Sequence, residues 1–144
     1  MIRIREAAYS DCECLAKLNQ AFNGVTRSSQ EIEAYISADG PTEIVLVAED
    51  SGVVVGFACL HTLRSFCYDP PWMEITELYV APSHRRAGTG ARLIDDAIRR
   101  AAEVGASEVL VRTNGSNGAA KGLFSHCGLQ QAPHIVFHRP IEPA

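Results

Sequence analysis

Apolar and polar side chains alternate at the start of the chain and then recur at helical spacing. Ile2 and Ile4 alternate with arginines, which is typical of a half-buried strand. Two helices are predicted next, because apolar residues follow three- and four-residue steps behind two Ser-x-x-Glu capping boxes. The boxes are residues 10–13 and 28–31, and the expected helix ends are residues 23–24 and 39–41.

The middle of the chain predicts three strands. Two β-branched runs, residues 44–48 and 53–60, flank the polar segment 49–52 and indicate a hairpin. Two prolines prevent strand pairing in the next segment, residues 64–72, so we expect a loop there. A further strand is predicted over residues 73–80.

The last third of the chain predicts two helices and two strands. An amphipathic helix is expected over residues 90–104. Residues 109–111 form a short apolar run, as expected of a buried strand that lies parallel to residues 73–80. Asn117 is expected to cap another helix, and a last strand is predicted at residues 135–137. The order β-α-α-β-β-β-α-β-α-β therefore predicts one α/β domain.

Composition narrows the class of protein. The chain has 144 residues, 47% of them hydrophobic, which suits one domain with one continuous core. Its formal charge of -4 lacks the basic surplus of proteins that bind phosphate backbones, so we expect no nucleic-acid partner. Charged residues near the N-terminus and the lack of a long apolar run predict neither a signal peptide nor a membrane span, and hence a cytoplasmic location. Five scattered cysteines without a C-x-x-C spacing indicate reduced thiols.

Residues 78–90 combine the end of a strand, a turn and glycines that open a helix. Gly88 and Gly90 let backbone N–H groups approach an anion, the helix start carries partial positive charge, and Arg85 and Arg86 add mobile positive charge. This combination predicts a pyrophosphate site, although an isolated G-x-G is also typical of an ordinary turn. The dinucleotide fingerprint and the nucleoside-triphosphate loop fit less well, because the third glycine of the first and the lysine of the second are absent.

Two blocks of sequence, residues 75–90 and 117–129, carry a resemblance that extends over nearly the whole chain. Residues 85–90 read Arg-x-x-Gly-x-Gly, and the second block reads Asn-x-x-Ala-x-x-Leu-Phe-x-x-x-Gly-Leu. In this order they resemble the R/Q-x-x-G-x-G/A and N-x-x-A-x-x-L-Y-x-x-x-G-F motifs of the GNAT superfamily. The resemblance implies an acetyl-CoA-dependent N-acetyltransferase, with a mixed, mostly antiparallel sheet, a V-shaped splay between its two central strands, and about four flanking helices.

The resemblance also implies how acetyl-CoA binds as co-substrate. Backbone N–H groups of residues 86–91 would bind the pyrophosphate, and the pantetheine arm would lie along the preceding strand. A bulge in that strand would aim the N–H of Leu78 at the thioester oxygen, where negative charge develops. Asn117 would reach the pantetheine arm, and a plain helix cap is an equally open role for it. The residues assigned to the cofactor are Leu78, Tyr79, Val80, Arg85, Arg86, Ala87, Gly88, Thr89, Gly90, Ala91, Asn117, Ala120 and Phe124.

An alkyl amine has a pKa near ~10.4, so a base must remove its proton before it attacks. By resemblance, Glu74 is the first candidate and Glu77 the second, and regular alternation puts them on opposite faces unless a bulge reverses it. For each, a solvated or salt-bridged carboxylate is the open alternative. Phe124 replaces the tyrosine that many relatives use as general acid, so water or another group must protonate the thiolate. The open substitutes are Tyr68, Tyr79 and Cys127.

Residues 24–40 and 61–73 are expected to form the acceptor walls, where acidic residues stand beside aromatic ones. Such walls suit a primary amine with an apolar or aromatic body, reacting directly in a ternary complex. No metal is expected, because His134 and His138 lie too far apart along a strand to share an ion. Peptide N-termini, protein lysines, a silent acyl-CoA sensor, a nucleotide-binding protein and a homodimer are left open. The wall residues are Glu31, Glu33, Asp39 and Asp69 with Tyr35, Phe66, Tyr68 and Trp72.

Overall fold

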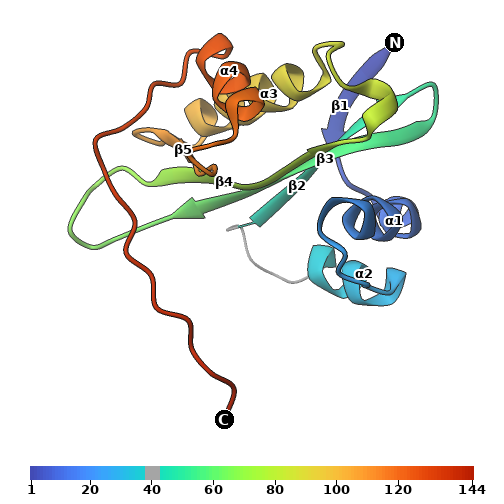
Figure 1. Cartoon of the computed structure of the whole chain (residues 1–144), viewed down its shortest axis with the longest axis horizontal. Helices are drawn as coiled ribbons and strands as arrows, with labels where there is room; N and C mark the ends of the chain where they lie inside the picture. The colour runs from blue at the N-terminus through green and yellow to red at the C-terminus, as the bar shows by residue number, and fades with distance from the viewer. Residues whose placement is uncertain (38–42) are drawn as a thin grey trace.

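The computed structural model describes residues 1–37 and 43–144 (Figure 1). Its strands are β1 (Ile2–Glu6), β2 (Glu43–Asp50), β3 (Val53–Leu63), β4 (Trp72–Val80) and β5 (Val109–Val111). Its helices are α1 (Cys12–Asn23), α2 (Ser29–Ser37), α3 (Thr89–Glu103) and α4 (Gly118–His126), with the short 3₁₀ turns η1 (Tyr9–Asp11) and η2 (Pro82–His84).

The strands form one sheet in the order β1-β2-β3-β4-β5. Neighbours from β1 to β4 pair antiparallel, whereas β4 and β5 pair in parallel because α3 carries the chain back across the sheet. Helices α1 and α2 cover one face, and α3 and α4 cover the other (Figure 1). The predicted mixed, mostly antiparallel sheet with its flanking helices is confirmed. Among the helices described, none has the length and apolar character needed to cross a bilayer.

Alternation along the strands feeds one hydrophobic cluster on each face of the sheet. On the α3 face, Leu46 and Met73 are fully buried and pack with Leu93 and Ile94, which are also fully buried. These α3 residues belong to the single apolar stripe that the sequence spacing predicts. The cluster on the α1 face is smaller, and its buried members are Leu15, Val47, Val54, Phe57 and Tyr79.

The second predicted capping box forms, and the first does not. Ser28 Oγ accepts a hydrogen bond from the N–H of Glu31 at 3.1 Å, and Glu31 Oε1 accepts one from the N–H of Ser28 at 3.1 Å. Helix α1 instead begins after Asp11, because the Asp11 carboxylate accepts from the N–H of Ala8 at 2.7 Å and closes the turn η1 first. The predicted end of the second helix, residues 39–41, lies outside the described residues.

The predicted hairpin forms with longer strands than its apolar runs indicate. Strand β2 continues to Asp50 and β3 continues to Leu63, so the turn consists of Ser51 and Gly52 alone. Both turn residues have positive φ, 51° and 87°, which is the geometry of a tight two-residue hairpin turn. The tight turn lets polar residues that were expected to form the loop join the strand ladder instead.

The prediction of a last strand at residues 135–137 is wrong. After α4 the chain runs as an extended tail that leads away from the sheet (Figure 1). Ile135, Val136 and Phe137 are 75%, 66% and 89% exposed. The backbone hydrogen bonds of a strand come from a neighbouring strand, and no described strand pairs with this segment, so its β-branched side chains alone do not create one.

Candidate active site

Strands β4 and β5 separate soon after they begin to pair. Their parallel register covers only Met73 to Ile75 on β4, although β4 continues to Val80. Beyond Ile75, no described strand pairs with this edge of β4. The V-shaped splay that the resemblance implies is therefore confirmed, and it leaves backbone groups of β4 without sheet partners.

The ladder between β3 and β4 determines which backbone groups face the split. The N–H of Ala81 donates to the carbonyl of Val55 at 2.8 Å, which fixes the residues of β4 that bond to β3. Because an antiparallel ladder alternates, the N–H and C=O groups of Leu78 and Val80 point away from β3 and toward the split. The Val80 carbonyl is used there by Arg85, whose Nε donates to it at 2.8 Å.

The loop after β4 and the start of α3 present a run of unpaired backbone N–H groups at residues 86–91, which we call the free-amide loop. Within the described part of the chain, none of the N–H groups of residues 86–91 donates a hydrogen bond to the protein. The first N–H in use is that of Arg92, which donates to the Gly88 carbonyl at 3.0 Å. Gly88 and Arg86 both have positive φ, 84° and 62°. A non-glycine residue with positive φ, two positions before a left-handed glycine at a helix start, suits the binding of an anion.

The two glycines of the motif have different roles. Gly88 caps α3 in the left-handed conformation, and a Cβ there would meet nothing within 4 Å. A Cβ on Gly90, in contrast, would approach Cδ2 of Leu123 to 3.1 Å, so this glycine lets α3 and α4 pack closely. Between them, the Thr89 hydroxyl is buried and lacks a hydrogen-bond partner among the described residues. An unsatisfied buried hydroxyl at this helix start is compatible with a polar ligand.

The two arginines of the motif also differ. The guanidinium of Arg85 lies 5.4 Å from the ring centre of Tyr79 and bonds to the Val80 carbonyl, so it is held by β4 and is not the mobile charge that the sequence predicts. Arg86 is exposed and forms no ion pair with a described residue. Of the pair, Arg86 has the freedom to follow a ligand.

Residues of α4 border the same region. Asn117 Oδ1 accepts from the N–H of Ala120 at 3.0 Å, so its predicted role as a helix cap is confirmed. Phe124 is partly buried and packs against the cluster on the α3 face. With no hydroxyl on its ring, Phe124 supplies packing and no proton.

A bulge in β4 decides where the two candidate glutamates lie. Cys59 pairs with Glu77 and the next residue of β3 pairs with Ile75, so Thr76 is an extra residue. The expected bulge is thus confirmed. Because of it, Glu74 and Glu77 share the face of α1 and α2, and the regular alternation that would separate them does not hold.

The surroundings of these two glutamates differ. The Glu74 side chain is 14% exposed, and one of its carboxylate oxygens lies 3.5 Å from Nη1 of Arg112. Glu77 is exposed and forms no ion pair with a described residue, and partial desolvation raises the pKa of its carboxyl. A carboxylate with a raised pKa and no cation beside it is the better proton acceptor.

Three further residues of this face, Glu43, Cys59 and His61, were not found as site residues from the sequence. Glu43 on β2 pairs with His61 on β3, and their side chains lie 3.4 Å apart. Desolvation, followed by the charges of Glu43 and Glu77, raises the pKa of Cys59 to about 12. Glu43, Cys59 and Glu77 therefore lie close together across three strands. Their grouping depends on strand register, which no local sequence signal reveals.

The expected acceptor walls are partly described. Phe66 and Tyr68, in the loop between β3 and β4, are 102% and 69% exposed, and Tyr35 on α2 is 61% exposed. The charge of Glu43 and a hydrogen bond to it raise the pKa of Tyr35, so this phenol lies beside Glu43. Glu31 is used in the capping box of α2, and Asp39 lies outside the described residues. All five cysteines are free thiols, as predicted.

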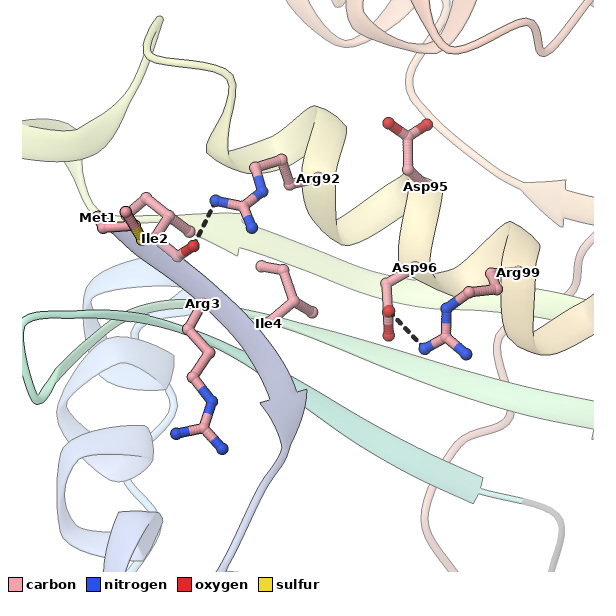
Figure 2. Close-up of a pocket in the computed structure, with 8 residues that line it drawn as sticks. All are labelled: Met1, Ile2, Arg3, Ile4, Arg92, Asp95, Asp96 and Arg99. Atoms are coloured by element: carbon pink, nitrogen blue, oxygen red, sulfur yellow. Dashed lines mark hydrogen bonds and ion pairs between the residues drawn. The ribbon is translucent and has the colours of Figure 1, made fainter.

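A groove between β1 and α3 lies elsewhere on the molecule (Figure 2). Arg92 crosses it and donates to the Ile2 carbonyl, and Arg99 pairs with Asp96 at 2.7 Å. Strand β1 forms the edge of the sheet opposite to β5. This groove therefore lies away from the split and the glutamates, and it approaches the loop of residues 86–91 at Arg92, which directly follows that loop.

Comparison with known proteins agrees with this arrangement. The model of the acetyltransferase (GNAT) family matches residues 12–129. The sequence is 27% identical to an uncharacterized N-acetyltransferase, YhfO, of Bacillus subtilis (strain 168), over 99% of each chain. The fold is similar to that of an aminoglycoside acetyltransferase, meta-AAC0020, from an uncultured soil metagenomic sample in complex with sisomicin, with a TM-score of 0.84, 19% identity and coverage of 98% of this chain and 97% of that one. It is also similar to aminoglycoside N-acetyltransferase AAC(6')-Iy in complex with CoA, with a TM-score of 0.83, 19% identity and coverage of 97% and 95%.

Proposed function

Since this chain belongs to the acetyltransferase (GNAT) family and is therefore an acetyl-CoA-dependent acyltransferase, we propose that its acceptor is the primary amine of a small cationic molecule. The observation that carries the proposal is the arrangement of β4. Strand β4 borders the split along its β5 side and leads into the free-amide loop after Val80. The same strand presents Glu74 and Glu77 on one face. Donor and acceptor would thus meet along a single strand.

The free-amide loop supports binding of the acetyl-CoA pyrophosphate. Six consecutive N–H groups, from Arg86 to Ala91, are without acceptors in the described protein, at the positive end of the α3 dipole. Arg86 would add charge, and the buried Thr89 hydroxyl would gain a hydrogen-bond partner. The pantetheine arm would lie in the split along residues 78–80, beside Asn117, which caps α4, and beside Ala120 and Phe124 of α4.

Glu77 is proposed as the base. Glu77 accepts a proton from the bound ammonium group, directly or through one water, and the neutral amine then forms its bond to the thioester carbon. The nitrogen, positively charged in the adduct, loses its second proton to water. The oxygen becomes an oxyanion, which the outward-facing N–H of Leu78 would stabilise. The C–S bond then breaks, and CoA leaves as a thiolate, whose proton comes from water because Phe124 has none to give. Glu74, paired with Arg112, would contribute charge and position.

The acidic face supports a cationic acceptor. Glu43 on β2 and Glu74 and Glu77 on β4 lie on one face of the sheet, on the two strands that flank β3. The exposed ring of Tyr35 lies beside Glu43, and Phe66 and Tyr68 are exposed in the loop between β3 and β4. An ammonium group would be attracted to such a face, and an apolar or aromatic body would pack on the rings. The structural neighbours named as aminoglycoside acetyltransferases, one in complex with sisomicin, support a small-molecule acceptor.

The test is release of free CoA thiol from acetyl-CoA with a panel of small amines, lysine peptides and peptides with free N-termini. We expect small cationic amines to give the highest kcat/KM. Glu77→Gln should lower kcat by about 10²–10⁴-fold, the usual range for loss of a general base. Glu74→Gln should have a smaller effect, and Glu13→Gln, an exposed glutamate of α1, should have none.

Two results would contradict the proposal. Thiol release with peptides alone would assign a protein acceptor instead of a small amine. Stabilisation by acetyl-CoA without thiol release for any acceptor would indicate a silent acyl-CoA sensor, since a ligand raises the melting temperature of the protein it binds whether or not it reacts.

A further inference from the structure

The last residue of η2 is held by a residue of the β2–β3 hairpin that is distant in the sequence. Nε2 of His84 lies 2.9 Å from Oδ2 of Asp50, the residue that ends β2 before the two-residue turn. Both side chains are partly buried. The contact holds the end of this hairpin against the segment that leads from β4 into the free-amide loop (Figure 1).

Both nitrogens of the His84 ring are engaged, which fixes the orientation of the ring. Nδ1 lies 2.8 Å from Oγ of Ser83. The bond to His84 is the main cause of a lowered pKa of Asp50, so Asp50 is a carboxylate at neutral pH and has no proton to give. Nε2 of His84 must therefore carry the hydrogen and donate it to Asp50. The other carboxylate oxygen, Oδ1, accepts from the N-terminal ammonium group at 3.1 Å and from the Ser51 hydroxyl at 3.3 Å.

The segment that His84 anchors continues into a strained part of the loop. Arg86, two residues later, has φ 62°, and a non-glycine residue keeps such a conformation only where the surrounding structure fixes it. After Arg86, the chain is fixed by α3, which packs against the sheet. Before it, His84 is fixed by Asp50, and Arg85 by a carbonyl of β4. Of these contacts, the one from Asp50 comes from the hairpin on the other side of β4.

We propose that Asp50, through His84, positions the free-amide loop for the pyrophosphate of acetyl-CoA, a role that rests on the proposed function. Neither side chain has to touch the cofactor, because the backbone N–H groups of residues 86–91 would donate to it. The directions of these groups depend on where the preceding residues are held, and a misplacement of about 1 Å can cost about 10²-fold in rate. Asp50 and His84 are therefore positioning residues for the cofactor and take no part in proton transfer.

Loss of the contact should weaken binding of CoA but not of pantetheine, which lacks the pyrophosphate. We expect His84→Ala to raise the Kd for CoA about 10–100-fold and to leave the Kd for pantetheine unchanged. Titrations followed by ligand-detected NMR measure both constants, and the preference for CoA is the ratio of the two. Any loss of folded protein affects both ligands alike, so this preference isolates the effect on the loop.

Two further substitutions of histidine separate the contact from the mere presence of the ring. His84→Gln should keep most of the preference for CoA, because its amide nitrogen can donate to Asp50 in place of Nε2. His138→Ala is the matched control, since it removes the same ring from an exposed position in the C-terminal tail. It should keep the wild-type preference.

A double-mutant cycle tests whether the two residues act as one contact. Adding Asp50→Ala to His84→Ala should lower the preference for CoA no further. The positioning role is refuted if His84→Ala keeps the wild-type preference, if His84→Gln is no better than His84→Ala, or if the two losses multiply. In each of these cases, a wild-type preference for CoA over pantetheine still supports the pyrophosphate site. A wild-type chain that binds both ligands equally would overturn the pyrophosphate site and the positioning role together.

Discussion

Asp11 connects the first strand to the first helix through a buried carboxylate. Its side chain is 7% exposed and accepts from Nη1 and Nη2 of Arg5 at 2.7 and 3.0 Å, and from the N–H of Ala8 at 2.7 Å. The bond to Arg5 is the main cause of a lowered pKa of Asp11, with the Ala8 bond adding to it against the effect of burial. Arg5 also pairs with Glu49 at 2.8 Å, so one guanidinium joins β1, β2 and η1.

We expect Asp11→Asn to lower the free energy of unfolding at pH 7 by about 2–4 kcal/mol, because it leaves a partly buried arginine short of its partner. The folded pKa is lowered, so the contribution of Asp11 is present above its unfolded pKa of about 3.9 and is lost as the pH falls below that value. Urea unfolding at pH 7 and pH 3 measures both effects. The exposed Asp95→Asn serves as control, and an equal loss in both variants would refute the role of the buried pair.

At the scale of the element, the loop from β4 into α3 depends on one left-handed residue. Gly88→Ala places a Cβ at φ 84°, which costs about 1–2 kcal/mol in the left-handed region, and the loop can avoid this cost by giving up its anion-binding shape. We expect the Kd for acetyl-CoA to rise about tenfold, since each 1.4 kcal/mol is a factor of ten. Isothermal titration calorimetry measures it. Gly118→Ala, where a Cβ meets nothing and φ is not positive, should leave the Kd unchanged, and equal effects would contradict the assignment.

An element can be predicted from the sequence when the contacts that form it lie within a few residues of one another. The stripe of α3 and the capping box at Ser28 arise from contacts within a few residues, so their spacing is visible in the chain. The motif around Gly88 is found for the same reason. The bulge at Thr76 was expected only by resemblance, and the pairing of Glu43 with His61 depends on the register of distant strands. At residues 135–137 a strand was predicted wrongly, because a sequence typical of a strand forms none where no described strand pairs with it.

At the scale of the whole molecule, the sheet separates the candidate cofactor region from the carboxylates. The split and the free-amide loop lie where β4 meets β5 and α3, whereas the carboxylates gather on the face of α1 and α2. Strand β4 belongs to both regions. The donor and the acceptor would therefore approach from different sides, and the acidic groups would not lie beside the anionic pyrophosphate.

This separation predicts the pH dependence of the reaction. Desolvation raises the pKa of Glu77, and only its ionised form accepts a proton, so kcat/KM should fall on acidification at a pH above the usual carboxyl pKa of about 4.3. In Glu77→Gln, the remaining activity should lack this acidic limb. Rates measured from pH 4 to pH 9 with one amine test it. An unchanged acidic limb in Glu77→Gln would assign the titration to another group.

The additional residue in β4 has a consequence for how this protein can be altered. Ile75 and Glu77 pair with consecutive residues of β3, so a chain lacking Thr76 would keep every side chain of β4 on its present side. Such a deletion would straighten the β4 backbone and keep the same side chains on each face of the sheet. An inserted residue would instead move every later side chain of β4 to the opposite face. Deleting Thr76 thus changes the length and curvature of β4 without changing which side chains lie on each face. Comparing the deletion variant with the wild-type chain would therefore measure what the curvature of β4 contributes to activity.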